Sequence, residues 1–347
     1  VSEEPAIASM DRDYSFYGTF QHTNVTLESR YLQARLDPNA YNRVDAMRQL
    51  TDIERIKLLS DPNDVVSNDW LTLYGEIISD TSIPAALKAY FLRIDEQPLD
   101  RAYAMWYQEL VVAREKLMLA VNRLYKGPML ELFNNLDTYS VSKRRSPKDG
   151  IEERMLKNIL LDLIVVDDSA ESHAVILAHF ESATTASDRV ASLLALNRST
   201  APQRRAALED VYSKWHIHLS GYANYLRVVS SGTREDVFEM IEAEKKRPGF
   251  DITQPTWTRA LFLPMAANNK MVWTLEGTRW VADKVIELAP LNATTTGRLL
   301  NTFQHVRSLK PRLQGNVREA LERIVQRVSQ TECPAVYGQA KAYLDSL

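Results

Sequence analysis

The residues that could bind a metal ion or act as nucleophiles are few in this chain and are unsuitably spaced. The six histidines include no HExxH pair, and in His216-Ile217-His218 the two imidazoles would point to opposite sides of a helix. No Gly-x-Ser-x-Gly turn is present to expose a nucleophilic serine. The single cysteine, Cys333, excludes an internal disulfide and a cysteine-based zinc site. We therefore expect no metal site and no catalytic residue within these 347 residues.

Phosphate-binding and nucleic-acid-binding signatures are also missing from the sequence. Neither GxGxxG nor GxxxxGK[ST] occurs, and the chain has only 11 glycines. The 42 basic and 45 acidic residues give a net charge of −3, whereas nucleic-acid-binding domains are usually basic. The basic clusters at 143–145 and 245–247 fall in predicted loops or helix C-termini, where they complement the helix dipole. We expect no nucleic-acid partner.

One stretch in the last third of the chain has a composition suited to binding. Between residues 253 and 280, three tryptophans accompany Arg259, Arg279 and the adjacent amides at 268–269. Short helices joined by ordinary hydrogen bonds would explain this composition. The other explanation is a concave surface, lined by aromatic and arginine side chains, that binds a peptide or a partner domain.

The elements that would position these residues are helices. From about residue 26 the apolar residues recur at i, i+3, i+4 and i+7, most clearly over 100–127, where Asp100 is the predicted N-cap and Gly127-Pro128 the predicted end. Further helices are predicted over 150–166, 278–288, 295–308, 315–329 and 334–346. Because the breaks are short, neighbouring helices should be antiparallel. The sequence predicts an all-α fold, an α-solenoid or curved superhelical array of paired antiparallel helices.

The first 22 residues differ from the rest. Tyr14, Phe16 and Phe20 alternate with polar residues, which predicts a β-strand over 13–20 that needs a sheet from elsewhere. No run of 18 apolar residues and no signal peptide is present, so we expect a cytoplasmic protein with no membrane partner.

Several short motifs follow one another in an order typical of one family. They begin with Pro5-Ala6-Ile7-Ala8-Ser9 and end with the series Gln254-Pro255-Thr256, Arg259-Ala260-Leu261, Asn269 and Gly277-Thr278-Arg279-Trp280. Between them lie segments 154–158, 185–191 and 212–216. Together these motifs resemble the C-terminal region of bacterial aminopeptidase N, in the gluzincin zinc alanyl-aminopeptidase family. Gln-Pro-Thr stands where the family has Asn-Pro-Asn, and Arg-Ala-Leu where it has Arg-Ser-Leu.

The resemblance implies a function as well as a fold. Residues 1–22 would be a strand and linker from a preceding β-sandwich domain, and 23–347 a helical, non-catalytic C-terminal domain. That domain would cap the catalytic cleft and gate peptide access for hydrolysis of N-terminal residues. Its partners would be the catalytic and β-sandwich domains and the peptide substrate.

The resemblance also implies where the chemistry lies. The zinc would be in the catalytic domain, so this chain needs no cofactor and, lacking HExxH, should be inactive alone. The residues implied to line the substrate chamber are Arg259 and Asn269, followed by Gln254, Arg189 and Arg279.

A second hypothesis needs no enzymatic parent. The chain would then be a stand-alone helical-repeat scaffold that binds a protein or peptide on its concave face. An upstream coding region containing HExxH and a downstream Glu would favour the peptidase, whereas a start codon just before Val1 would favour the scaffold.

Overall fold

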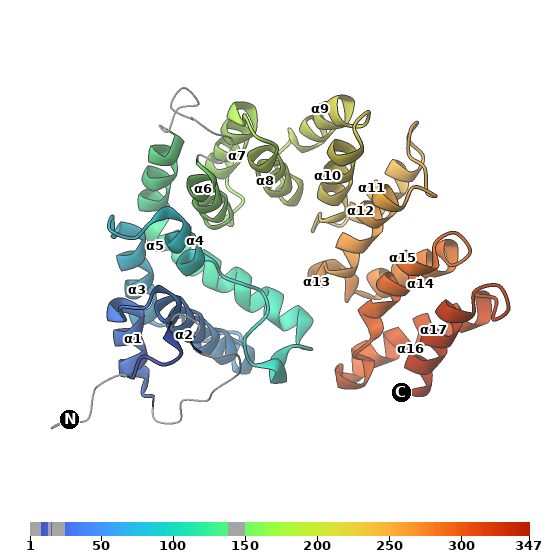
Figure 1. The fold of residues 1–347 in the computed structure, drawn as a ribbon, viewed down its shortest axis with the longest axis horizontal. Coiled ribbons are helices and arrows are strands. Elements are labelled where there is room, and N and C mark those ends of the chain that lie inside the picture. The colour runs from blue at the N-terminus through green and yellow to red at the C-terminus, as the bar shows by residue number, and fades with distance from the viewer. Residues whose placement is uncertain (1–7, 13–14, 16–24, 138–149) are drawn as a thin grey trace. The chain divides into compact units, whose positions relative to one another are not determined.

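The described part of the chain is helical throughout. The computed structural model describes residues 8–12, 15, 25–137 and 150–347, which form seventeen α-helices and a few 3-10 turns without a β-strand (Figure 1). The predicted all-α fold is confirmed. The predicted strand over 13–20 lies almost wholly outside the described residues. The boundary between 1–22 and 23–347 therefore stays a prediction.

The described residues fall into two compact units. Unit 1 is built from residues within 1–101 and 112–167. Its helices are α1 (Leu27–Leu36), α2 (Ala40–Ser60), α3 (Asn68–Ser79), α4 (Ala85–Leu92), most of α5 (Tyr107–Asp137) and α6 (Ile151–Ile164). In its core α1, α3 and α4 pack on α2, and α4 also packs on α6. Trp70, Tyr74 and Phe91 are fully buried there, and each such side chain stabilises the fold by roughly 1.5–3 kcal/mol.

Unit 2 comprises residues 102–111 and 168–347. Its helices, after the first residues of α5, are α7 (Ala170–Ser182), α8 (Ala186–Arg198), α9 (Arg204–Trp215), α10 (Leu219–Ser230), α11 (Val237–Lys245), α12 (Pro255–Ala266), α13 (Asn269–Val272), α14 (Leu275–Leu288), α15 (Ala293–Leu300), α16 (Pro311–Arg327) and α17 (Pro334–Asp345).

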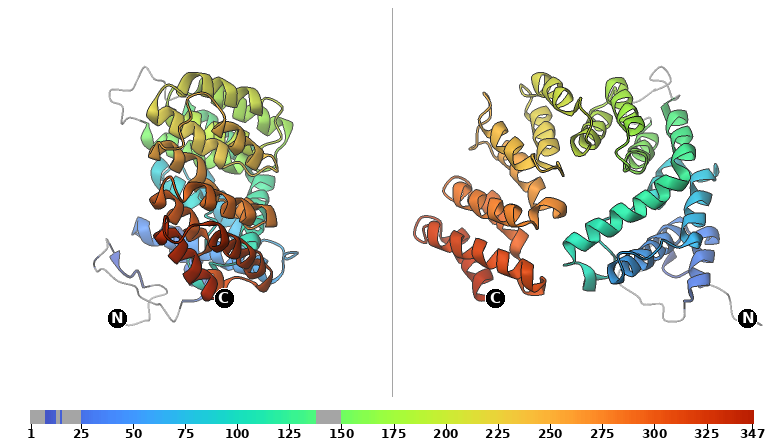
Figure 2. Two further views of the ribbon diagram at one scale, coloured as in Figure 1. Left: turned by 90° about the vertical axis from the view of Figure 1, so that its right-hand side faces the viewer. Right: turned by 180° about the vertical axis from the view of Figure 1, so that it is seen from behind.

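Many helices of unit 2 pack on a chain neighbour and also on the next helix but one. Leaving out the one-turn helix α13, α8 packs on α10, α10 on α12, α12 on α15 and α15 on α17, while α14 packs on α16. A stack of two-helix repeats produces this two-step pattern. In the orange and red part of Figures 1 and 2, the pair α14 and α15 lies beside the pair α16 and α17.

Side-chain caps and prolines begin many of these helices. Side-chain oxygens of Thr26, Ser67, Thr185 and Thr274 accept a backbone N–H from the first turn of α1, α3, α8 and α14. Pro311 and Pro334 are the first residues of α16 and α17, where no backbone donor is needed. The helices predicted over 278–288, 315–329 and 334–346 are thus confirmed with small shifts of their ends, and 295–308 forms α15 followed by two 3-10 turns.

The long helix α5 departs from the prediction at both ends. It begins at Tyr107 rather than Asp100, because residues 101–103 form a separate 3-10 turn. It also continues through Pro128 to Asp137, so the predicted end at Gly127-Pro128 was wrong. Pro128 removes one backbone donor, but the apolar face continues beyond it in Met129 and Phe133, which are buried. Burial of that face outweighs the lost hydrogen bond.

Side chains from adjacent helices bind carbonyl groups near helix C-termini. Nδ2 of Asn122 in α5 donates to the carbonyl oxygens of Leu163 and Ile164, at 2.9 and 2.8 Å, where α6 ends. Nδ2 of Asn197 in α8 donates to the carbonyl of Val228 in α10, at 2.8 Å. The last carbonyls of a helix have no partner inside it. These bonds satisfy such groups and fix neighbouring helices to each other.

No helix formed by the described residues has both the length and the apolar character needed to cross a bilayer.

Candidate functional site

The stretch singled out by its composition forms consecutive helices of unit 2, α12, α13 and α14. Gln254 lies directly before α12, and its Oε1 accepts the backbone N–H groups of Thr256 and Trp257, so the amide is the N-cap of the helix. Pro255 occupies the first helical position. The side-chain oxygen of Gln254 is therefore engaged in starting α12.

Arg259 lies one turn into α12 and is exposed to solvent. Its Nε donates to the carbonyl oxygen of Pro255, at 3.0 Å, within the same helix. In the described part of the chain its two terminal nitrogens form no further hydrogen bond or ion pair. The outer edge of the guanidinium is thus open to an oxygen ligand from outside the domain.

Asn269 begins α13 and contacts a tryptophan. Its Oδ1 accepts the indole Nε1–H of Trp273, at 3.0 Å. The Trp273 ring in turn stacks on Tyr107 of the same unit, with centroids 4.3 Å apart and planes 9° apart. Gln108 donates to the backbone carbonyl of Trp273, at 3.3 Å. Asn269 therefore helps to orient the aromatic ring that holds the start of α5.

The other two predicted arginines form local contacts. Nη2 of Arg279 in α14 donates to Oε1 of Glu319 in α16, at 2.9 Å, and half of the Arg279 side chain is exposed. Nη2 of Arg189 in α8 donates to the carbonyl of Ala183, at 3.0 Å, and its guanidinium lies 4.8 Å from the ring centroid of Phe180. The hydrogen bonds of Gln254, Arg189, Arg259 and Arg279 run to none of the other predicted residues. Arg259 combines exposure with an open guanidinium.

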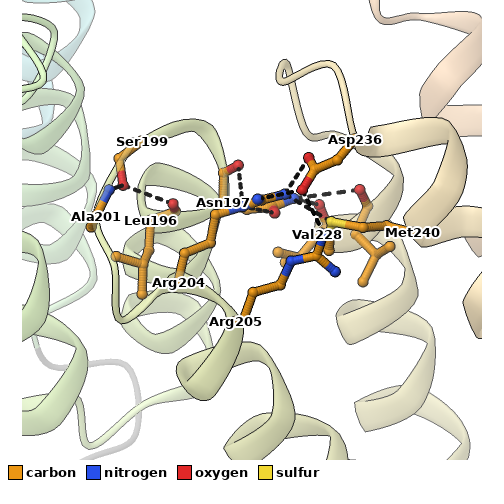
Figure 3. A network of polar contacts seen from close by, with 10 residues as sticks. Leu196, Asn197, Ser199, Ala201, Arg204, Arg205, Val228, Asp236 and Met240 are labelled. Atoms are coloured by element: carbon orange, nitrogen blue, oxygen red, sulfur yellow. Dashed lines mark hydrogen bonds and ion pairs between the residues drawn. The ribbon is translucent and has the colours of Figure 1, made fainter.

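A charged network surrounds Arg204, the first residue of α9 (Figure 3). Its side chain is buried, and its two terminal nitrogens donate to the carboxylate of Asp236, each at 2.8 Å. Its Nε donates to the backbone and side-chain oxygens of Asn197, both at 3.1 Å. The hydrogen bonds from Arg204 hold the pKa of Asp236 below its ordinary value. This network joins α8, α9 and the start of α11.

A second network surrounds Arg247, two residues beyond α11. Its terminal nitrogens donate to the two oxygens of Glu209 in α9, at 3.1 and 2.7 Å. Its Nε lies 2.9 Å from Oε1 of the buried Glu244, which also accepts the hydroxyl of Tyr225, at 2.7 Å. Burial raises the pKa of Glu244, although Tyr225 and Arg247 oppose that shift. The network joins α9, α10 and α11.

Comparison with known proteins gives these helices a family. A family described as "Domain of unknown function (DUF3458_C) ARM repeats" matches residues 27–331, most of the chain. The chain belongs to the DUF3458_C family. ARM repeats are stacks of helices, in agreement with the packing pattern of unit 2.

Two proteins to which the chain is similar are named aminopeptidase N. The DUF3458_C chain is 24% identical over 329 residues to aminopeptidase N of Caulobacter vibrioides, covering 93% of this chain and 38% of that protein. It is 20% identical over 186 residues to aminopeptidase N of Escherichia coli, covering 53% of this chain and 21% of that protein. The predicted likeness to the C-terminal helical domain of aminopeptidase N is confirmed.

A solved structure has the same fold. The crystal structure of Legionella pneumophila aminopeptidase A in complex with aspartic acid matches with a TM-score of 0.79 at 20% identity. The match covers 94% of this chain and 39% of that one. The DUF3458_C chain thus spans less than half the length of each of these proteins.

The described residues of this DUF3458_C domain do not suit zinc. They contain no group of three or more His, Cys, Asp or Glu side chains placed to hold a metal ion. The Nδ1 of His216 instead lies 2.9 Å from the carbonyl of Tyr212, on whose ring the imidazole stacks.

Sequence reasoning missed the roles of Arg204 and Arg247. The cluster at 245–247 was interpreted only as charge at a helix end, and α11 does end at Lys245. The spacing of Glu244 and Arg247 was the available indication, because residues three apart meet at the end of a helix. Glu209 and Tyr225 lie too far away in sequence to be paired with Arg247 without coordinates.

Proposed function

We propose that this DUF3458_C domain is the C-terminal, non-catalytic part of a cytoplasmic zinc aminopeptidase, where it walls the active-site chamber and gates the entry of peptides. The family match and the shared fold support this proposal, as does the fraction of each aminopeptidase that the chain spans. Zinc, which activates water for amide hydrolysis, would be held by a catalytic domain outside this chain. The partners would be that domain, a β-sandwich domain and the peptide substrate.

Within this proposal Arg259 receives the peptide. The observation that carries this role is its exposed guanidinium, whose outer edge is open while its Nε is held by the carbonyl of Pro255. A guanidinium binds a carboxylate or a peptide carbonyl through paired, charge-assisted hydrogen bonds. Anchoring Nε fixes the direction of the planar group and reduces the entropy lost when a peptide binds.

Replacing Arg259 tests this role in the full-length protein encoded by the gene. Arg259→Ala should raise the KM for tri- and tetrapeptides by about tenfold, the value of one charge-assisted hydrogen bond. The KM for a small chromogenic amino-acid amide should stay unchanged, because that substrate does not reach Arg259. The matched control is Arg323→Ala in α16, which removes an exposed arginine paired with Asp283.

Two results would contradict the proposal. Equal losses on both substrates, or no loss on either, would remove Arg259 from peptide binding. A coding region without HExxH and a downstream Glu would remove the enzymatic parent and favour the helical scaffold.

A further inference from the structure

Arg247 lies in the connection between α11 and α12, residues 246–254, and contacts side chains of two helices. Arg247 reaches back to α9, where its terminal nitrogens bind both oxygens of Glu209 at 3.1 and 2.7 Å. Its guanidinium also lies over the ring of Tyr212, 4.0 Å from the centroid. A planar guanidinium can bind both oxygens of a carboxylate through its fork while its flat face stacks on a ring, whereas an ammonium has no planar fork for this geometry.

The inner side of the same guanidinium faces a buried carboxylate. Glu244 is 3% exposed, and its Oε1 lies 2.9 Å from Nε of Arg247 and accepts the hydroxyl of Tyr225. Its Oε2 has no hydrogen-bond partner within the described residues. A buried carboxylate depends strongly on its cation, so this contact matters more than the one to Glu209, which is 59% exposed and screened by water.

Further hydrogen bonds, and a glycine turn, fix the rest of the connection. The hydroxyl of Tyr212 donates to the carbonyl of Pro248, at 3.1 Å. Gly249 has a positive φ of 90°, which a residue without a Cβ adopts readily. Further on, Oδ1 of Asp251 accepts the backbone N–H and the hydroxyl of Thr253. The chain therefore turns into α12 through a series of fixed contacts.

The first turn of α12 is attached to the same part of the unit. The hydroxyl of Thr258 donates to the carbonyl of Ile252, at 2.6 Å, and Nε1 of Trp257 donates to the carbonyl of Leu219 at the start of α10, at 3.3 Å. The Trp257 ring packs edge-on against Tyr222. Arg259 follows directly and donates to the carbonyl of Pro255. The position of Arg259 therefore depends on how the connection at 246–254 packs against α9 and α10.

We propose that Arg247 is a positioning residue, which clamps the connection at 246–254 to α9 and α11 and thereby holds the first turn of α12, with Arg259, where the peptide is received. This inference rests on the proposed function for its effect on substrates. The clamp itself depends only on contacts within unit 2.

Hydrogen exchange on the full chain measures the clamp. Arg247→Met keeps an apolar stem and removes the guanidinium, and it should accelerate amide exchange across 246–258 by about tenfold, since charge-assisted bonds are lost. Arg247→Lys should recover only part of the protection, because lysine lacks the planar fork. Lys214→Met is the matched control, since it removes an exposed cation of α9 that pairs with Asp210 one turn away in the same helix.

Steady-state kinetics on the full-length protein measure the positioning. Arg247→Met should raise the KM for tri- and tetrapeptides by about threefold to tenfold. It should leave kcat and the KM for the small chromogenic amide unchanged, because the lost interaction stabilises the bound substrate and the transition state equally. The double variant Arg247→Met/Glu244→Gln removes the uncompensated buried charge. Its melting temperature should return toward that of the wild type, whereas the fast exchange and the raised peptide KM should persist.

The outcomes separate the two proposals. Unchanged exchange across 246–258 in Arg247→Met would overturn the clamp. Fast exchange with an unchanged peptide KM, or a double variant that recovers KM together with stability, would overturn the positioning role. The proposed function is tested separately by the kinetics of Arg259→Ala. The hydrogen-exchange result does not depend on that outcome.

Discussion

At the residue scale, two arginines with bonds to carboxylates determine how neighbouring helices are arranged in this domain. Arg204 is 6% exposed, and each of its donor groups meets an oxygen of Asp236 or Asn197. Such a group is costly to bury and is tolerated only when its bonds are complete. Arg247 is more exposed than Arg204, but it compensates Glu244, which is buried. Each arginine thus fixes one arrangement of its neighbouring helices.

The Arg204 network should make stability depend on pH in the acid range. Hydrogen bonds from Arg204 hold the pKa of Asp236 below its ordinary value, so the folded state favours the ionised carboxylate. The stability it contributes is complete above the unfolded pKa, near 3.9, and is lost as the pH falls through the lowered folded pKa. We expect Asp236→Asn to unfold more easily than the wild type at pH 7, by about 1 kcal/mol because the carboxylate is partly exposed.

That difference should shrink below about pH 4. Urea unfolding of both proteins between pH 2.5 and 7 measures it. A difference that stays constant or grows on acidification would show that Arg204 does not stabilise the ionised form of Asp236.

At the element scale, the helices are defined by their apolar period, but their ends and contacts are defined by neighbours. Asn122 binds the end of α6 from a distance of about forty residues in sequence. The end of α5 shows the same dependence, since Met129 and Phe133 are buried beyond Pro128. A local rule that stops a helix at Gly-Pro fails when packing continues past that point.

Glycine substitutions test the packing between two of these elements. A Cβ added to Gly277 in α14 would lie 2.7 Å from the Cα of Val272 in α13, so Gly277→Ala should destabilise the domain by roughly 1–3 kcal/mol. A Cβ added to Gly315 in α16 would have no side chain or neighbouring element of the described chain within 4 Å. Gly315→Ala should therefore stabilise it by about 0.5–1 kcal/mol, because alanine favours the helix.

Thermal unfolding of the two alanine variants beside the wild type provides the measurement. If the melting temperatures of both variants shifted in the same direction, the close approach of α14 to α13 would not restrict the size of the side chain at position 277.

At the scale of the whole molecule, the described residues form helical units with large apolar cores and no metal-ligating cluster. The stability of the chain should therefore come from packing between repeats.

A chelator tests this statement directly. EDTA should leave the melting temperature of the purified chain unchanged, and added zinc should produce no hydrolysis of an amino-acid amide, because the described residues hold no group of side chains placed to bind a metal ion. A melting temperature that falls by several degrees in EDTA, or hydrolysis that depends on zinc, would reveal a metal site in the chain.

The amino-acid sequence by itself determined the helical class, most helix positions and the relationship to aminopeptidases. These follow from local periodicity and from the order of short motifs, both of which are written along the chain. Only the tertiary structure decided that Gln254 caps α12, that Asn269 orients Trp273 and that Arg259 has an open edge. It also paired Arg247 with Glu209 and Tyr212. The reason is that the stacking of the helices decides which side chains meet. When two residues lie far apart in sequence, no local pattern identifies them as partners.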